Sequence, residues 1–354
     1  MNTIFCVIFT LLTIGSNGFS QGLKRISITD FSFPGVAIRA IDAINDSTVW
    51  FAGSKGVWGY TQNSGKTWTI DTLKIDRANP EIRSVKVTPN GNIYLVNIAN
   101  PAGVYKSINK GKSWTLVYTD TAQDAFFDAI DFWDNQNGIL LGDASKNCLH
   151  IAITKNGGDS WFRVDCDSIP STLFGENPFA ASNSNIGLGP SSVFIPTGGK
   201  SKSRVFYSTN LGNSWKVSST PIIAGEQMTG IFSIDMSSDS IGIVAGGNWD
   251  KADMECNNLA LTRNGGLTWE PLNNKNNSSY ISCIKFLPDG SNQFLISLSA
   301  RVREGKSAIG IYSFITNKWQ IFDNPKNYLA IQLSSKNYGW VSGKGWIGHL
   351  EIKN

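Results

Sequence analysis

The chain has 354 residues and a formal net charge of +4, with 16% charged residues, 35 glycines, 19 phenylalanines and 12 tryptophans. Many aromatic residues and glycines with few charges are typical of short strands joined by tight turns, so we expect an all-β protein. The small positive charge favours anionic partners, but it is too weak to indicate a nucleic-acid-binding protein.

Residues 1–20 have the pattern of a signal peptide. An apolar run over residues 4–14 is too short to span a bilayer, and the small residues Gly18 and Ser20 precede a cleavage site that we place before Gln21. No lysine or arginine precedes the run, so an uncleaved anchor or a buried strand is the alternative. No later segment is apolar enough to cross a membrane, and none resembles a linker. We expect a secreted or periplasmic protein, monomeric and not membrane-spanning, whose residues 21–354 form one domain.

A turn motif recurs five times along the chain. Each copy reads [Ser/Thr]-x-Asn-x-Gly-x-[Ser/Thr]-Trp. Its defining residues are Asn63, Gly65 and Trp68; Asn109, Gly111 and Trp114; Asn156, Gly158 and Trp161; Asn210, Gly212 and Trp215; and Asn264, Gly266 and Trp269. A degenerate sixth copy over residues 316–319 keeps the tryptophan and lacks the glycine. Self-similarity at a regular interval indicates a repeat architecture.

The chemistry of this motif is structural. The asparagine side chain can accept hydrogen bonds from nearby backbone N–H groups, and the glycine supplies a positive φ that other residues adopt only with strain. The hydroxyl at the first position can bond the turn from the other side. The tryptophan begins the return strand, where its ring can pack between neighbouring sheets. We interpret the motif as a hairpin lock.

The motif resembles the Asp-box, or BNR, repeat, with asparagine replacing the usual aspartate in every copy. The resemblance implies that each copy joins the third and fourth strands of a propeller blade. Successive tryptophans, including Trp319, lie 46, 47, 54, 54 and 50 residues apart, which suits one blade per interval.

The predicted innermost strands share a short apolar pattern. They cover residues 38–42, 82–86, 127–131, 231–235, 281–285 and 328–332, and a further blade is expected from residues 179–181 and 192–195. The last blade lacks a fourth strand, which we assign to residues 24–28. This pairing would join the two ends of the chain and protect a sheet edge. We predict a seven-bladed β-propeller of four-stranded antiparallel blades, closed by the N-terminal strand.

Several segments between the turns resemble a narrower family, the secreted propellers related to the photosystem II stability/assembly factor. These segments are residues 124–134, 138–143, 195–199, 230–235, 244–247 and 258–266. The resemblance covers essentially all of residues 35–350. It implies a module that binds a partner protein through a basic face, by analogy with the family.

Four cysteines follow the signal peptide, an even number for an oxidising compartment. Cys148 and Cys166 lie nine residues on either side of Gly157, so antiparallel pairing would bring them within disulfide reach. A one-residue bulge would instead put them on opposite faces. By elimination, Cys256 and Cys283 would form a second bridge. Their spacing does not match a zinc site, and we expect no metal and no cofactor.

The loops opposite the repeated turns carry a concentration of cationic residues. The candidates for binding are Arg39, Arg83, Lys146, Lys200, Lys202, Lys251, Arg301, Arg303 and Lys344, with Lys55 and Lys306 nearby. We expect this basic loop face to attract an acidic segment or a free carboxylate, although an ordinary solvated surface has a similar composition. Trp249 is either an exposed anchor for a partner or a lid over its own loop.

A ring of polar residues is expected around the central channel, three positions further along the innermost strands. It comprises Asp42, Lys86, Asp131, Ser182, Asp235, Lys285 and Gln332, and we interpret it as ion pairs and hydrogen bonds that hold the blades together.

The function expected from the sequence is binding of a protein or other anionic partner through the basic loop face. The alternative is a glycan-active hydrolase, which would need two facing carboxylates; Asp128 and Asp143 are the nearest candidates. A sialidase would need an arginine triad that the nine arginines do not form in a recognisable pattern, and only His150 and His349 could serve histidine chemistry. A purely structural or adhesin-like role is a third possibility.

Overall fold

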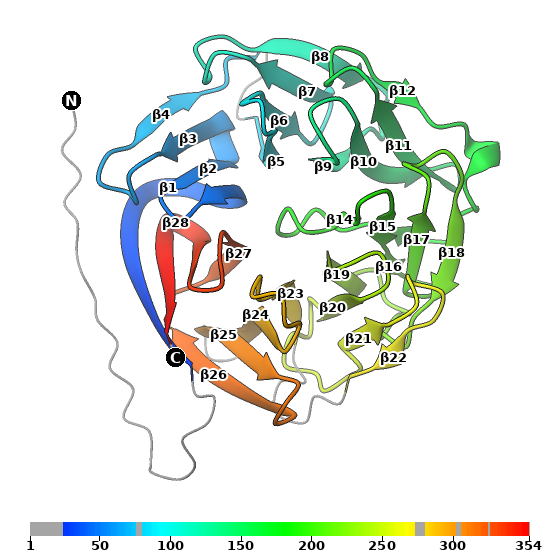
Figure 1. Ribbon diagram of the computed structural model, residues 1–354. Helices are drawn as coiled ribbons and strands as arrows, with labels where there is room; N and C mark the ends of the chain where they lie inside the picture. The colour runs from blue at the N-terminus through cyan, green and yellow to red at the C-terminus, as the bar shows by residue number, and fades with distance from the viewer. Residues whose placement is uncertain (1–23, 76–79, 273–279, 302–305, 325, 354) are drawn as a thin grey trace.

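The computed structural model describes residues 24–75, 80–272, 280–301, 306–324 and 326–353, and the predicted signal peptide lies outside them. These residues form six antiparallel sheets arranged around a central axis, which is the architecture of a β-propeller (Figure 1). Two short 3-10 helices, η1 (Ser54–Gly56) and η2 (Cys166–Ser168), interrupt the strands. Within the described residues, no helix has the length and apolar character needed to span a membrane.

Four of the six sheets have four strands each. One contains β5 (Ile82–Val87), β6 (Ile93–Asn97), β7 (Ala102–Ser107) and β8 (Thr115–Asp120). The next contains β9 (Phe127–Phe132), β10 (Gly138–Ser145), β11 (Cys148–Thr154) and β12 (Phe162–Arg163). A third contains β14 (Gly187–Leu188), β15 (Val193–Pro196), β17 (Arg204–Ser208) and β18 (Lys216–Ser219). The fourth contains β23 (Ile281–Phe286), β24 (Phe294–Arg301), β25 (Lys306–Ser313) and β26 (Lys318–Asn324).

The two remaining sheets have six strands each. In one, the spatial order is β13 (Glu176–Asn177), β16 (Gly198–Gly199), β19 (Thr229–Met236), β20 (Gly242–Asn248), β21 (Leu259–Thr262) and β22 (Glu270–Pro271). In the other, it is β27 (Tyr328–Leu333), β28 (Tyr338–Lys353), β1 (Arg25–Asn45), β2 (Thr48–Gly53), β3 (Val57–Thr61) and β4 (Thr69–Thr72).

The prediction of seven blades of four strands is wrong, because the strands form six sheets. The reason is the length of β1, which continues for 21 residues. Its first half pairs with β28, from Arg25 opposite Lys353 to Ser32 opposite Trp346, and its second half pairs with β2. The strands expected to form the first and last blades are therefore parts of one sheet. The N-terminal and C-terminal strands do pair with each other, as Figure 1 shows.

Each repeated turn is held by the same set of side-chain bonds. In the second copy, Asn109 Oδ1 accepts from the Ser113 N–H at 3.0 Å, while Ser107 Oγ accepts from the Gly111 N–H at 2.9 Å. The other four copies repeat these bonds within a few tenths of an ångström. Each of these bonds joins residues four positions apart, which makes the turn a local unit.

The glycine of the turn also lets neighbouring sheets approach each other. A Cβ atom on Gly111, whose φ is +80°, would lie 2.1 Å from the ring of Trp58 in the preceding sheet. A Cβ atom on Gly65 would likewise lie 2.1 Å from the ring of Phe31, which belongs to the same six-stranded sheet. Apolar clusters fill the space between sheets, as where Trp58 and Trp50 pack against Ile82 and Leu95. This buried area supplies most of the stability that such a fold can draw on.

Residues 179–181 do not form the innermost strand that the sequence suggested. That position is taken by the two-residue strand β14, and residues 178–186 follow an irregular path. We call residues 179–185 the plug, because their hydrogen bonds cross the centre of the propeller. Small and polar residues suit this course, since backbone groups without strand partners need side-chain ones.

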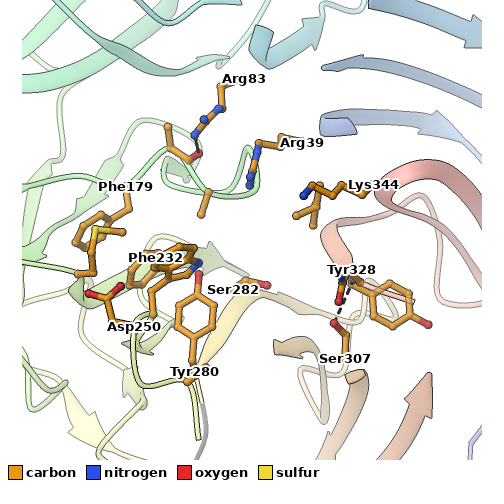
Figure 2. Close-up of a pocket in the computed structure, with 17 residues that line it drawn as sticks. Arg39, Arg83, Phe179, Phe232, Asp250, Tyr280, Ser282, Ser307, Tyr328 and Lys344 are labelled. Carbon is orange, nitrogen blue, oxygen red and sulfur yellow. Dashed lines mark hydrogen bonds between the residues drawn. The ribbon is translucent and has the colours of Figure 1, made fainter. Parts of the chain in front are cut away.

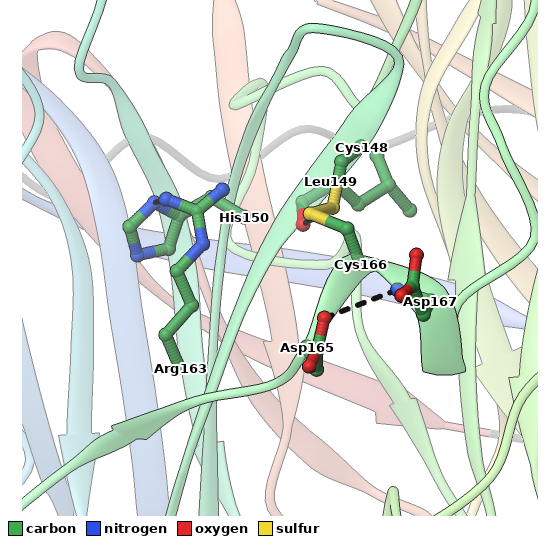
Figure 3. The surroundings of a disulfide bond; sticks show 7 residues. All are labelled: Cys148, Leu149, His150, Arg163, Asp165, Cys166 and Asp167. Atoms are coloured by element: carbon green, nitrogen blue, oxygen red, sulfur yellow. Dashed lines mark hydrogen bonds between the residues drawn. A yellow bond between two sulfur atoms is a disulfide. The ribbon is translucent and has the colours of Figure 1, made fainter.

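Cys148 and Cys166 form a disulfide that ties η2 to β11, with their Cα atoms 5.7 Å apart (Figure 3). The register of β11 and β12 pairs Ala152 with Arg163, so Cys166 approaches Cys148 from just beyond the end of β12. The prediction of a second bridge is wrong, because Cys256 and Cys283 do not form a disulfide. Cys283 is fully buried on β23, where its sulfur lies 3.5 Å from Ser184 Oγ.

Candidate functional site

Six of the innermost strands, all except the short β14, share a β-bulge at the same position of their apolar pattern. On β1, Ile38 pairs with Gly53 and Ala40 with Ala52, which leaves one residue extra between them. The same register shift recurs on β5, β9, β19, β23 and β27. The six extra residues, which we call the bulge ring, are Arg39, Arg83, Asp128, Phe232, Ser282 and Leu329. A bulge redirects a side chain from the face of the sheet, so the repeat places six side chains at one end of the channel.

A cavity of about 810 Å³ opens at this end, and five of the six bulge-ring residues line it; Asp128 does not. Its volume lies in the range of pockets that bury a small ligand or a short chain segment. Figure 2 shows cationic side chains gathered along one side and aromatic ones along the other.

Arg39, Arg83 and Lys344 form the cationic side, which we call the basic wall. Arg83 Nη1 donates to the carbonyl oxygen of Ala180 at 3.1 Å, and Arg83 Nε lies 3.4 Å from a carboxylate oxygen of Glu81. Among the described residues, Arg39 Nε has no hydrogen-bond partner.

Burial lowers the pKa of Arg39, and the positive charge of Arg83 lowers it further, against smaller opposing effects of Glu81 and Tyr280. An anion beside Arg39 would stabilise its guanidinium group, because it would offset both the burial of that group and the positive charge of Arg83. A carboxylate fits this requirement, since arginine can contact it with two parallel hydrogen bonds.

The aromatic wall consists of Phe179, Phe232, Tyr280 and Trp249. The rings of Phe179 and Phe232 stack with centroids 4.1 Å apart, and Tyr280 meets Phe232 edge-on at 4.8 Å. Trp249 is 53% exposed and lines the cavity, so it is not folded away as a lid over its own loop. Large apolar side chains and a few polar groups are typical of a ligand-binding pocket.

The plug crosses the centre of the propeller beside the cavity, which Ala180 and Ala181 line. Asn183 Nδ2 donates to the carbonyl oxygens of Ile41 and Val85, at 3.3 and 3.2 Å, and Ser84 Oγ donates to Asn183 Oδ1. On the other side, Ser182 and Ser184 bond to β23 and β19. The plug therefore connects four of the inner strands, which obstructs the channel at the level of the cavity.

The structure brings together four of the predicted binding residues, Arg39, Arg83, Trp249 and Lys344. Others lie on the exposed surface outside the cavity: Lys55, Lys146, Lys200, Lys202 and Lys251. Of these, Lys251 forms an ion pair with Glu226 at 2.6 Å, and Lys200 stands over the ring of Phe174. Arg301 ends β24 and Lys306 begins β25, and Arg303 lies outside the described residues.

Phe179, Phe232 and Tyr280 were missed as site residues, because aromatic residues in strand patterns are usually core. The position of Phe232 within its strand could have identified it as a site residue. Phe232 occupies the same place in its strand as Arg39 and Arg83 do in theirs, one residue after the first apolar residue of the pattern.

Asp128 and Asp143 lie on neighbouring strands, but neither lines the cavity. Asp128 is 1% exposed, and among the described residues neither of its carboxylate oxygens has a hydrogen-bond partner. Burial raises the pKa of Asp128 well above its ordinary value, Asp143 raises it further, and Arg83 opposes both. Burial also raises the pKa of Asp143, to about 7.

The predicted polar ring around the channel forms contacts between sheets. Lys86 pairs with Asp131 at 2.7 Å, and Lys285 pairs with Asp235 at 3.1 Å. Asp42 accepts a hydrogen bond from the backbone N–H of Val87 in the next sheet. In the described part of the chain, no three histidine, cysteine, aspartate or glutamate side chains gather as metal ligands would.

Comparison with known proteins places this architecture among the β-propellers. No family model and no curated protein matches the sequence, so membership of the Asp-box repeat family stays a prediction. Similar solved structures include YCF48 bound to D1 peptide, with a TM-score of 0.66 at 15% identity over 92% of this chain and 97% of that one. YCF48 from Cyanidioschyzon merolae has a TM-score of 0.59 at 14% identity, covering 90% and 96% of the two chains. A streptogramin B lyase has a TM-score of 0.65 at 13% identity, covering 93% and 98%. These similarities establish the β-propeller fold of the chain.

Proposed function

We propose that this protein is a binding module that holds a carboxylate-bearing segment of a partner protein in the cavity at the bulge ring. The observation that carries the proposal is the convergence of Arg39, Arg83 and Lys344 on one wall of that cavity. A propeller of similar fold has been solved with a peptide bound, which supports a protein partner. The predicted signal peptide of residues 1–20 supports export, so we propose that the partner is met outside the cytoplasm, by a monomeric domain of residues 21–354.

The two walls would act on different parts of the segment. A carboxylate beside the basic wall would provide acceptors for Arg39 and offset the repulsion between the two guanidinium groups. Each hydrogen bond to a charged group contributes about 1.5–3 kcal/mol when it is well formed. An apolar side chain on the aromatic wall would remove Trp249 and Phe232 from water, at about 25 cal/mol per Å² of apolar surface.

Direct binding of a model peptide tests the proposal. The probe is a rhodamine-labelled hexapeptide that alternates aspartate and leucine, and its anisotropy is measured against the full chain. We expect binding that weakens between 50 and 500 mM salt, because exposed charges are screened over about 10 Å at 0.1 M. The double variant Arg39→Gln, Lys344→Gln should bind at least about tenfold more weakly, since each lost charge-assisted bond is worth more than 1.4 kcal/mol.

The matched control is Lys200→Gln, Lys202→Gln, which removes the same charge from the exposed surface outside the cavity. It should bind the peptide almost as tightly as the unaltered protein. A second peptide with lysine in place of aspartate should not bind. Equal losses in the two double variants, or binding that salt does not weaken, would show that the cavity is not the site.

A further inference from the structure

Asp128 and Asp143 occupy neighbouring β-bulges at the edge of the proposed site. Asp128 is the bulge-ring residue of β9 and follows Arg83 in the ring. Asp143 is the extra residue between Gly142 and Ala144, where β10 shifts its register against β11. Its backbone N–H bonds to the carbonyl oxygen of Phe126, at 2.9 Å, which fixes it beside the start of β9. The two bulges thus place two acidic residues on neighbouring strands, off the regular strand faces, where the charge of Asp143 acts on Asp128.

The burial of Asp128 favours the neutral, protonated form of its carboxyl group. Its side chain is shielded from water and receives no hydrogen bond from the described residues. A buried carboxylate without hydrogen bonds is costly, so the neutral acid is favoured. A second carboxylate nearby adds repulsion, and the pair therefore holds a proton more strongly than either group alone.

Arg83 is the cation that acts on Asp128, and it is also part of the basic wall. Glu81 already lies 3.4 Å from its Nε, and the carbonyl oxygen of Ala180 accepts from its Nη1. Other charged groups lie on the strands and loops around the pair. His150 on β11 contacts Asp120 and Arg163, and Glu176 on β13 forms an ion pair with Arg204. The remaining ones are Arg39 on β1 and, beside β10, Asp124 and Lys146. Most of these are paired among themselves, which leaves Arg83 as the link between the acid pair and the cavity.

We propose that the Asp128–Asp143 pair is a protonation switch for the cavity: while both acids are protonated, Arg83 is available to a ligand carboxylate, and once the pair loses a proton its negative charge competes with the ligand for Arg83. This inference rests on the proposed function, because it concerns the regulation of the same site.

The direction of the effect follows from the charges. The pKa of Asp143, raised to about 7 by burial, places the change near neutral pH. Below this value the acid pair adds little negative charge, and the basic wall attracts a carboxylate fully. Above it the added negative charge offsets Arg83, and affinity falls. At an effective dielectric constant of about 20, one added negative charge on the acid pair should weaken the binding of a peptide carboxylate roughly tenfold.

The test measures the same rhodamine-labelled peptide at pH 5.5 and pH 8.5, at constant ionic strength. Its aspartates are ionised at both values, since their ordinary pKa is about 3.9. The full chain should bind about tenfold more tightly at pH 5.5. The double variant Asp128→Asn, Asp143→Asn should bind tightly at both pH values. Asp124→Asn is the matched control, because Asp124 is an exposed acid that bonds Ser145 of β10 and does not line the cavity; this variant should keep the pH dependence of the unaltered protein.

Carbon-13 NMR of the aspartate carboxyl groups in the unaltered protein provides a readout that depends neither on the peptide nor on folding of the variants. A carboxyl signal that titrates near pH 7 is expected. Aspartate titrations that are all complete below pH 5.5, or peptide binding that is equally tight at pH 5.5 and 8.5, would overturn the switch and leave the proposed function intact. Absence of peptide binding at pH 5.5 would overturn the proposed function itself, and the switch with it.

Discussion

Replacing Gly111 with alanine should destabilise the propeller by two separable effects. Gly111 has a φ of +80°, and a side chain in the left-handed region costs about 1–2 kcal/mol. The added Cβ would also lie 2.1 Å from the ring of Trp58. That ring is 2% exposed and packs against Trp50 and Trp114, with centroids 5.8 and 5.3 Å away, so it has little room to move. Overpacking of this kind costs about 1–3 kcal/mol, and together the effects amount to about 2–5 kcal/mol.

Thermal unfolding followed by circular dichroism measures this loss. An unfolding entropy near 2.1 cal/mol/K per residue gives about 0.7 kcal/mol/K for 354 residues, so Gly111→Ala should lower the Tm by about 3–7 °C. Gly91→Ala is the matched control, because Gly91 has a φ of +86° and a Cβ added there would have no atom within 4 Å. It should lose only about 1–3 °C from the backbone effect. If both variants lost the same amount, the contact between sheets would not matter and the reasoning would fail.

Two further perturbations test other contacts in the sheet that contains β11. His150 is buried, and burial lowers its pKa to about 4 from an ordinary 6.5, with Arg163 lowering it further and Asp120 opposing. His150 takes up a proton in the unfolded chain at a higher pH than in the folded protein, so the free energy of unfolding should decline as the pH falls from 6.5 to 4. The variant His150→Gln should show a weaker pH dependence of unfolding in that range. If the two proteins had the same pH profile of unfolding, this assignment would be contradicted. Opening the Cys148–Cys166 bridge, which closes a loop with a sequence separation of 18, should cost about 3 kcal/mol, or about 4 °C in Tm. A reductant that leaves the Tm unchanged while releasing both thiols would refute that value.

The repeated turn could be predicted from the sequence because its bonds are local. Ser107, Asn109 and Gly111 satisfy one another within a few residues, so the pattern of residue types already contains the geometry. Six of the innermost strands were recognisable for a similar reason, since each begins with the same apolar pattern, whereas the strand expected at residues 179–181 did not form. Arg39 and Arg83 could be placed near one mouth of the channel from their position in that pattern.

The composition of the site depended on contacts between distant segments. From the sequence, Phe232 and Tyr280 resemble core residues. In the structure, the bulge on β19 directs Phe232 toward Phe179, which lies about fifty residues earlier in the chain, and Tyr280 packs against Phe232. Most of the lysines predicted for the basic face stand apart from the cavity, because a count of loop charges does not say where each loop points.

By itself, the sequence determined the all-β class, the hairpin lock and six of the innermost strands, because these depend on hydrogen bonds and periodicities within about ten residues. Only the tertiary structure decided the number of sheets, since nothing local shows that β1 continues from its pairing with β28 to its pairing with β2. The course of the plug was likewise decided only by the tertiary structure. Phe179 and Ala180 look like a strand, and Asn183 leaves that path because its partners, Ile41 and Val85, lie about a hundred residues away or more. Long-range partners of this kind outweigh local preference wherever a segment has no strand to pair with.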